Sequence, residues 1–318
     1  MSNTCIVTGA AGFIGSQLSD ALLSAGWRVI GIDALDNNYD CRIKEWNLES
    51  LKARREFQWI HGDLMEIDLT EILKGAHFVF HLAARPGVRD SWGENYRIYD
   101  RQNVLATQRL LEACIITRPR RLIYASSSSV YGEMPGRPVR EDDAKRPMSP
   151  YGVSKLAGEH LVMAYHRCFK QSVAALRYFT VYGPRQRPDM AFHRFFRAIM
   201  TNNEILVFGD GNQTRDVTFV GDIVHATIQA MDQGSENGIY NIGGGHRVSI
   251  NEILKTMEKI LGQSIRIKYE KRPAGDPLHT GADIALARRE ISFKPKILLE
   301  EGLREMALWM DACLRRGL

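Results

Sequence analysis

The chain opens with Thr8-Gly9-Ala10-Ala11-Gly12-Phe13-Ile14-Gly15, a glycine-rich turn between an apolar run and a segment of helical periodicity. Glycines let the backbone approach a pyrophosphate, which the dipole and free N–H groups of a helix N-terminus stabilise. A second apolar run ends at Asp33, about 20 residues further on, where a carboxylate can accept from adenosine ribose hydroxyls. Alternatively, the glycines serve only to allow a tight turn between a strand and a helix, but this interpretation gives Asp33 no role. The glycine turn and Asp33 together predict dinucleotide binding. NAD is favoured over NADP because the Asp33 carboxylate repels a 2′-phosphate.

Short apolar runs alternate with longer helical segments through the first half of the chain. This rhythm is typical of βαβ units, which build a parallel sheet covered by helices on both faces. We therefore predict an α/β fold with a Rossmann-type doubly wound parallel sheet. The predicted strands are 4–8, 28–32, 57–61, 78–82, 122–125 and 173–177, and the clearest predicted helices are 12–25, 99–117 and 151–169.

The pattern changes after about residue 177 to loops rich in Pro, Gly and Arg, with shorter helices between them. We expect residues 1–177 to form an NAD-binding Rossmann domain, rejoined by about 216–242. Residues 178–318 are expected to form mainly a smaller C-terminal α/β substrate-binding lobe. The helices predicted in this second half are 191–201, 222–231, 249–261 and 298–314.

Composition argues against several classes of protein. The 318 residues are 44% apolar and 25% charged, and the net charge of +5 is scattered along the chain, so a nucleic-acid surface is disfavoured. The 5 cysteines are odd in number and form no CxxC pair, and the histidines lack metal-ligand spacing. We expect no disulfide framework and no metal, and a reducing cytoplasmic location. No basic leader or long apolar run predicts export or membrane insertion.

Tyr151 and Lys155 stand four residues apart, on one face of a predicted helix. A tyrosine with a pKa near ~10 is a poor base at neutral pH, but a nearby cation and a positive nicotinamide ring favour its phenolate. Tyr151 can then remove a proton from a sugar hydroxyl while a hydride leaves the same carbon. The serine-rich turn 126–129 follows an apolar strand at its carboxyl end, where ligands bind in open α/β sheets. No Gly-x-Ser-x-Gly elbow surrounds these serines, which disfavours a hydrolase nucleophile.

These motifs resemble the extended short-chain dehydrogenase/reductase superfamily. The resemblance covers essentially the whole chain and rests on the GxxGxxG spacing, on Asp63-Leu64 after the third strand, on His81-Leu82-Ala83-Ala84 after the fourth and on Asn103 in the next helix. It implies that Asp63 and Leu64 contact adenine. The cofactor-binding residues expected from the motifs and the resemblance are Gly9, Gly12, Phe13, Ile14, Gly15, Asp33, Asp63, Leu64, Leu82, Ala83, Ala84, Asn103, Tyr151, Lys155 and Tyr178.

The same resemblance assigns a role to the serine-rich turn. In the superfamily a Ser or Thr three residues before the Val of a Val-Tyr-Gly unit hydrogen-bonds the reacting hydroxyl. That position is Ser127 here, with Ser128 as the second candidate. Dehydratases and decarboxylases of nucleotide sugars carry an acid directly before this Val, whereas this chain carries Ser129. Without the acid, the simplest cycle is oxidation at C4, rotation of the keto intermediate and hydride return, which is 4-epimerisation.

Residues 176–191 look like the UDP-glucuronate 4-epimerase subgroup. UDP-glucose 4-epimerases usually carry Asn where Thr180 stands and lack the string that contains Arg187 and Met190. The Thr180 hydroxyl and the Arg185 guanidinium can hold a sugar carboxylate through charge-assisted hydrogen bonds. Holding it also prevents loss of CO2 from the β-keto acid that oxidation at C4 creates. Alternatively, Arg185 and Arg187 are solvated loop charges or serve only the diphosphate. Met190 is counted with the substrate-binding residues.

Two later segments resemble nucleotide-binding elements of the superfamily. The first, 208–216, is similar to the segment whose arginine grips the UDP diphosphate, a role that falls to Arg215. The second, 272–277, is similar to an element whose acid binds the uridine ribose, here Asp276, with Arg272 near the phosphates. Arg85 and Arg89 follow the His-Leu-Ala-Ala motif where the family often has a neutral residue, and can add a cation to the sugar pocket.

The resemblance thus implies an NAD-dependent epimerase that interconverts UDP-glucuronate and UDP-galacturonate. Its expected partner is the UDP-sugar, with no nucleic acid and no membrane. A homodimer is implied in which helices 99–117 and 151–169 pair with their copies, although a core helix needs the same apolar stripe. The alternatives are a 4-epimerase of UDP-glucose or UDP-N-acetylglucosamine, a UDP-glucuronate decarboxylase, an oxidoreductase that releases NADH, and a binding module with an inactive site.

Overall fold

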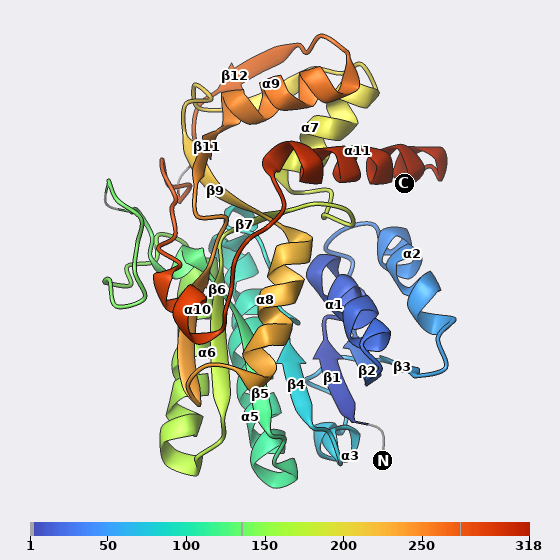
Figure 1. The fold of residues 1–318 in the computed structure, drawn as a ribbon, viewed down its shortest axis with the longest axis vertical. Helices are drawn as coiled ribbons and strands as arrows, with labels where there is room; N and C mark the ends of the chain where they lie inside the picture. The colour runs from blue at the N-terminus through green and yellow to red at the C-terminus, as the bar shows by residue number, and fades with distance from the viewer. Residues whose placement is uncertain (1–2, 135, 274) are drawn as a thin grey trace.

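The computed structural model describes residues 3–134, 136–273 and 275–318. A seven-stranded parallel sheet of order β10-β6-β5-β4-β1-β2-β3 forms its larger part (Figure 1). The order reverses between β1 and β4, and ligands of open α/β sheets bind at the carboxyl ends beside such a reversal. The predicted doubly wound fold is confirmed. The strands are β1 (Thr4–Thr8), β2 (Arg28–Asp33), β3 (Phe57–His61), β4 (Phe78–His81), β5 (Arg121–Ser127), β6 (Val173–Tyr178) and β10 (Asn237–Ile242).

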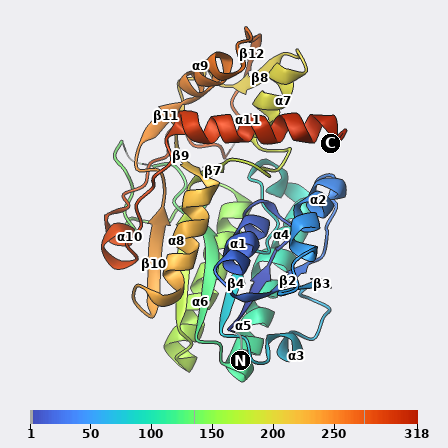
Figure 2. The same cartoon turned by 45° about the vertical axis from the view of Figure 1, so that its right-hand side comes forward.

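Both faces of the sheet are buried under helices. On β1, Ile6 belongs to one apolar cluster while Cys5 and Val7 belong to the other, as the alternation of side chains along a strand requires. Helices α1 (Phe13–Ser24) and α8 (Val220–Asp232) pack together on the Cys5 side, with α2 (Cys41–Lys52) against α1 (Figure 2). The other face carries α3 (Leu69–Leu73), α4 (Tyr96–Tyr99), the π-helical turn η3 (Asp100–Leu105), α5 (Ala106–Thr117) and α6 (Pro150–Phe169).

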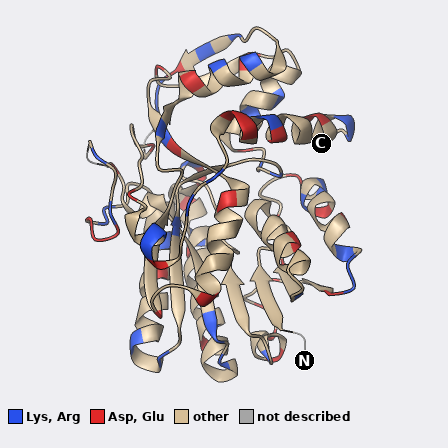
Figure 3. Cartoon of the chain, in the orientation of Figure 1, with Lys and Arg blue, Asp and Glu red and all other residues tan. Residues whose placement is uncertain are grey.

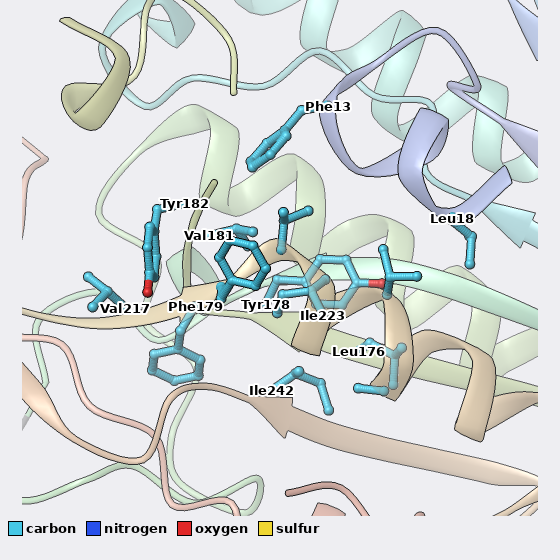
Figure 4. Close-up of a cluster of buried hydrophobic side chains, with 14 of the residues drawn as sticks. Phe13, Leu18, Leu176, Tyr178, Phe179, Val181, Tyr182, Val217, Ile223 and Ile242 are labelled. Atoms are coloured by element: carbon cyan, nitrogen blue, oxygen red, sulfur yellow. The ribbon is translucent and has the colours of Figure 1, made fainter. Parts of the chain in front are cut away.

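The remaining elements form a smaller part above the carboxyl ends of the strands (Figure 1). Its core continues that of the sheet: Figure 4 shows Leu176, Tyr178 and Ile223 in one cluster with Val181 and Val217. Its helices are α7 (Ala191–Met200), α9 (Ile250–Leu261) and α11 (Leu299–Arg315), whereas α10 (Ala285–Glu290) packs against β10 at the edge of the large sheet. Its strands are β7 (Thr180–Tyr182), β9 (Thr214–Phe219) and β11 (Arg247–Ser249) in one sheet, with β8 (Ile205–Phe208) and β12 (Ile267–Glu270) in another.

The structure differs from the sequence prediction at several elements, of which three bear on the site. β5 extends through Ser127, which lengthens the strand toward the cavity described below. β10 was not predicted as a strand, because its Asn and Gly residues disfavour one, and it pairs with β6 at the sheet edge. The helix predicted over 99–117 is interrupted by the π-helical turn η3. The domain boundaries themselves stay a prediction.

Charged residues of both signs are interspersed over the helices and loops (Figure 3), as expected from the scattered charge in the sequence. Within the described residues, no helix is both long and apolar enough to cross a membrane. The same part of the chain contains no group of three or more His, Cys, Asp or Glu residues placed to hold a metal ion.

Candidate active site

The glycine-rich turn forms part of a cavity at the carboxyl ends of β1 and β4. Gly9 has a φ of +73°, and a Cβ there would lie 2.9 Å from the Ala83 amide nitrogen. A Cβ on Gly15 would lie 2.0 Å from the Gly9 carbonyl oxygen. Gly12, the N-cap of α1, has no side chain to bond the first N–H groups of the helix. The turn therefore presents backbone donors to a phosphate at close range.

Asp33 ends β2 at the same cavity. Its Oδ2 accepts a hydrogen bond from the Ala11 N–H at 3.1 Å, and its Oδ1 accepts from the Leu35 N–H at 2.9 Å. Burial raises the pKa of Asp33, while the Lys44 ammonium opposes that shift. The two backbone bonds fix the carboxylate and leave it lone pairs that ribose hydroxyls can use.

One cavity brings together the predicted cofactor-binding residues with the exception of Asn103. The Asn103 side chain is used within the protein, because it donates to the Arg85 carbonyl at 3.0 Å and to Ser154 Oγ at 2.9 Å. Asn103 thereby fixes the segment after β4 that lines the cavity. The predicted residues that line it are Gly9, Gly12, Phe13, Ile14, Gly15, Asp33, Asp63, Leu64, Leu82, Ala83, Ala84, Tyr151, Lys155 and Tyr178.

Helix α6 begins where the sequence supplies a cap and a proline. Ser149 Oγ accepts from the Gly152 N–H at 3.1 Å, and Pro150 occupies the first turn. This start places Tyr151 in the first turn and Lys155 one turn later, both lining the cavity. Ser127, at the end of β5, lies near enough to Tyr151 that its hydroxyl acts to lower the pKa of Tyr151. The structure thus brings the three predicted catalytic side chains near one another.

The cavity disfavours charge on both ionisable partners. Burial raises the pKa of Tyr151, although the Ser127 hydroxyl and the Arg187 guanidinium act to lower it. Burial lowers the pKa of Lys155 to about 7, and the Glu159 carboxylate opposes this shift. A positive charge brought next to Tyr151 is therefore what would favour its phenolate.

A buried ion-pair network fixes the positions of these side chains. The guanidinium of Arg177, which is 0% exposed, lies 2.6 Å from the Glu159 carboxylate. Ser126 Oγ donates to the same carboxylate at 2.7 Å, and Arg177 also donates to the Tyr131 hydroxyl at 2.6 Å. Because loss of one partner would leave an unpaired buried charge, the network ties β5, α6 and β6 rigidly together behind the catalytic residues.

Two arginines close together in the sequence point in different directions. Arg185 pairs with Asp20 of α1 at 2.8 Å and lines a second cavity between α1 and α8. Its φ of +65° turns the chain so that its side chain leaves the first cavity. Arg187 instead lines the cavity that holds Tyr151, where Asp189 pairs with it at 2.9 Å. Of the two arginines, Arg187 therefore lines the cavity with Tyr151, and Arg185, which was expected to face the sugar, does not.

The predicted nucleotide residues meet in a cluster of charges. Arg215 pairs with Asp276 at 2.6 Å, and Arg89 lies 3.7 Å from the same carboxylate. The Arg89 guanidinium also lies 4.2 Å from the centre of the Phe208 ring. Arg272, four residues before Asp276 in the same loop, is exposed. The loop after β4, the end of β8, strand β9 and the loop after β12 thus meet at this cluster.

The other predicted substrate residues lie in different surroundings. Thr180 is half-buried at the start of β7, where it pairs with Val217 of β9, two residues after Tyr178 of the cavity. Met190 packs against the main apolar cluster. Arg85 lines the cavity, so this departure from the family pattern does add a cation to it.

The model of the NAD dependent epimerase/dehydratase family matches residues 5–243 of the chain. The chain belongs to this family. Its NAD dependence confirms the cofactor that the glycine turn and Asp33 predicted. Within the family, the chain is 38% identical over 311 residues to the UDP-glucuronate 4-epimerase of Thermodesulfobacterium geofontis, covering 96% of this chain and 95% of the relative.

A second relative and a solved structure are similar to this chain over nearly its whole length. The uncharacterized UDP-glucose epimerase YtcB of Bacillus subtilis is 42% identical over 309 residues, covering 96% of this chain and 98% of the relative. A crystal structure of UDP-glucuronic acid 4-epimerase from Bacillus cereus, in complex with UDP-glucuronic acid and NAD, superposes with a TM-score of 0.95. It is 42% identical in sequence, and the match covers 98% of this chain and 99% of that chain.

Sequence reasoning missed one wall of the cavity. Asn38, Tyr39 and Lys44 line it, from the loop before α2 and from the first turns of that helix. The available signal was Asp40, which caps α2 by accepting from the Arg42 N–H at 3.0 Å. The Asp40 cap predicts where the helix begins, but it does not predict which side chains of the helix line the cavity.

Proposed function

We propose that the protein is a UDP-glucuronate 4-epimerase that interconverts UDP-glucuronate and UDP-galacturonate with bound NAD. The observation that carries the proposal is the Arg187 guanidinium, which lines the same cavity as Tyr151 and Lys155. A cation there matches the carboxylate that distinguishes a uronic acid from a neutral hexose. The relatives from Thermodesulfobacterium geofontis and Bacillus cereus carry this activity in their names and support the assignment.

The cavity fits the cofactor at both of its charged features. The glycine turn and the N-terminus of α1 would hold the pyrophosphate, and Asp33 would accept from the adenosine ribose. Asp63 and Leu64 line the part of the cavity that would receive adenine. When bound, NAD supplies the hydride acceptor and donor for C4 of the sugar.

Tyr151 is proposed as the base that removes the proton from the C4 hydroxyl and later returns it. Ser127, near Tyr151, would hydrogen-bond the same sugar oxygen and hold it in line. Lys155 would stabilise the phenolate by its charge, since both side chains line one cavity. The 4-keto sugar must then turn over within the cavity, so that its other face is presented before the proton is returned.

The carboxylate of the sugar needs a partner during this rotation. The 4-keto form of a uronic acid is a β-keto acid, which loses CO2 when the carboxylate bond aligns with the carbonyl π system. Arg187 would prevent this alignment by holding the carboxylate through charge-assisted hydrogen bonds, with the Thr180 hydroxyl as a second donor. Ser129 stands directly before Val130 where dehydratases and decarboxylases of the resembled superfamily carry an acid.

At the nucleotide end, the diphosphate would draw Arg215 and Arg89 away from Asp276. Asp276 would then be free to accept hydrogen bonds from the uridine ribose, with Arg272 near the phosphates. In this assignment residues 1–177 together with 216–242 bind NAD, and the rest of 178–318 mainly binds the UDP-sugar.

The test is to incubate the purified protein separately with UDP-glucuronate and with UDP-glucose, and to follow products by NMR and mass spectrometry. The proposal expects an isobaric 4-epimer from the uronate and little turnover of the hexose. Turnover of UDP-glucose alone would transfer the assignment to the neutral sugar. A product lighter by CO2 would make the protein a decarboxylase.

We further propose a homodimer built on the helices that cover the α5 side of the sheet. Ile98 and Leu105 precede α5, and Val153 and Phe169 lie on α6; their exposed fractions are 39%, 46%, 45% and 57%. Exposed apolar side chains on adjacent helices are typical of a two-fold interface. Light scattering should give twice the chain mass, and Leu105→Asp combined with Val153→Asp should give the monomer. A monomeric unmodified protein would contradict this proposal.

A cytoplasmic location is part of the same proposal. The five cysteines Cys5, Cys41, Cys114, Cys168 and Cys313 are free thiols, as a reducing compartment favours. Fractionation of the native cells, with detection by antibody, should place the protein in the cytoplasm, and recovery outside it would overturn this part.

A further inference from the structure

We propose that α11 clamps α2 over the NAD cavity and thereby keeps the cofactor bound from one turnover to the next. The inference rests on the proposed function in one respect, because it takes the cavity beside α2 as the NAD site. It assigns to two aromatic side chains and one arginine, all remote from the reacting atoms, a positioning role that acts through α2.

One face of α2 belongs to the cavity. Lys44 and Tyr39 line it, and the Asn47 amide donates to the Ala11 carbonyl of the glycine turn at 3.0 Å. Lys44 Nζ also donates to the Asp36 carbonyl at 2.6 Å, which ties the helix to the loop after Asp33. This wall must move outward before a cofactor enclosed by it can leave.

The opposite face of α2 is held by the C-terminal helix. Trp46, two residues from Lys44 and so on the other side of the helix, stacks on Trp309 of α11 with ring centres 5.7 Å apart and an interplanar angle of 11°. The Arg316 guanidinium lies 4.8 Å from the centre of the Trp46 ring and pairs with Glu49 at 3.0 Å. Two neighbouring positions on α2 are therefore gripped by α11 from outside.

Helix α11 is itself held in place by contacts with α7 in the smaller part of the molecule. Trp309 makes an edge contact with His193 of α7, with ring centres 5.6 Å apart. The Arg197 guanidinium donates to the Leu318 carbonyl at 2.9 Å, which ties the end of the chain to the same helix. Met310, on the inner face of α11, is 0% exposed. Because α11 is fixed, outward movement of α2 must break the tryptophan stack and the ion pair.

An epimerase has a particular need for such a clamp. The hydrogen taken from C4 must return to the same sugar, so loss of the cofactor in mid-cycle would end turnover with a keto sugar in solution. Stacked aromatic pairs and a cation over a ring each add a modest stabilisation. Their combined loss should speed the release of NAD without altering the groups that contact the sugar.

The experiment measures the release of bound NAD from the purified holoenzyme into an excess of etheno-NAD, whose binding is followed by fluorescence. Trp309→Leu is expected to speed release about tenfold and Trp309→Phe, which keeps a stacking ring, less than about threefold. Arg316→Gln should lie between them. The matched control is Leu308→Ala, the preceding residue of α11, whose side chain is 75% exposed and which should release NAD at the unmodified rate.

A double-variant cycle separates the clamp from a general loss of stability. Trp46→Leu and Trp309→Leu remove the same stacking contact from opposite sides, and Trp46→Leu also removes the contact with Arg316, so the double variant should release NAD no faster than Trp46→Leu alone. Multiplied rates, or rates that follow the melting temperature across all variants, would overturn the clamp. So would release from Trp309→Leu at the unmodified rate.

The outcomes also distinguish the clamp from the proposed function. Faster release from Trp309→Leu in a protein that leaves UDP-glucuronate unchanged would support the clamp and overturn the substrate assignment. Normal release from that variant in an active epimerase would do the reverse. A purified protein that neither carries nor takes up NAD would overturn both.

Discussion

The cofactor half of the cavity and its sugar half are built in different ways. The cofactor half consists of backbone at the carboxyl ends of neighbouring parallel strands, with Gly9 and Gly15 packed too closely for any side chain. The part proposed to bind the UDP-sugar consists of long side chains far apart in the sequence, among them Arg187, which lines the cavity, and Arg215 and Asp276, which pair with each other. The first is fixed by the sheet itself, whereas the second depends on how each loop turns.

Arg185 and Arg187 show what the difference teaches. Both are arginines of one loop, two residues apart and with the same chemistry. A left-handed backbone at Arg185 directs its side chain to Asp20, while Arg187 enters the cavity. Chemistry carried by backbone can thus be located from sequence, but chemistry carried by flexible side chains on loops requires the fold.

The largest expected effect tests whether catalysis takes place at the carboxyl ends of the strands, where Tyr151 lines the cavity. Tyr151→Phe should lower kcat about 1000-fold while NAD stays bound, because the base is lost but the cavity keeps its shape. Tyr165→Phe on the same helix, whose hydroxyl bonds Glu112 away from the cavity, is the control and should remain active. Turnover by Tyr151→Phe at the unmodified rate would remove the proposed mechanism.

The two arginines sharpen the comparison within the sugar half. Arg187→Gln should lower kcat/KM for UDP-glucuronate about 100-fold, because a charge-assisted pair to the carboxylate is lost, and should release some CO2 during turnover. Arg185→Gln should change kcat/KM less than about threefold, since its partner is Asp20. Steady-state kinetics of both variants decide the matter, and the reverse order of effects would restore Arg185 to the site.

The buried ammonium of Lys155 predicts a pH-dependent stability. Its pKa is lowered to about 7 in the folded protein, against about 10.4 unfolded. Below pH 7 the folded state carries a buried charge, and stability rises as the pH rises from 7 to 10, because only the unfolded state then stays protonated. Lys155→Met should therefore stabilise the cofactor-free protein by about 2 kcal/mol at pH 6 and by less at pH 9.

Urea unfolding of both proteins at the two pH values measures this difference. Lys155→Arg, which cannot lose its charge, is the informative companion, because it should be least stable at both values. An equal effect of Lys155→Met at pH 6 and pH 9 would show that the ammonium is not buried as described.

The smallest effect is expected in the cofactor half. Asp33→Asn should weaken NAD binding about tenfold, because one charged acceptor for the ribose is lost while the glycine turn still binds the pyrophosphate. Isothermal titration of the cofactor-free protein measures the change. Complete loss of binding would contradict the view that backbone carries most of this half, and Asp142→Asn, an exposed acid that pairs with Arg140 away from the cavity, is the matched control.

Much of the fold and of the cofactor half followed from the sequence, because strand ends, glycine turns and helix caps are local signals. Tyr151 and Lys155 line one cavity as their i, i+4 spacing predicted, whereas the choice of Ser127 came from the family resemblance and stays a prediction. β10, Arg187 and the Lys44 wall were not, because their places depend on contacts between segments far apart. Asn103 and Arg185 have side chains suited to ligand binding, but in the folded protein they bind other residues of the chain.

The central claim is reversible oxidation at C4 of a uronic acid within one cavity, and a labelled substrate tests it most directly. UDP-glucuronate deuterated at C4 would be converted in the presence of excess unlabelled NADH, and the product examined by NMR and mass spectrometry. The account predicts UDP-galacturonate that keeps its deuterium on C4. Deuterium lost to water or to the NADH pool, or a product without its carboxylate, would contradict it.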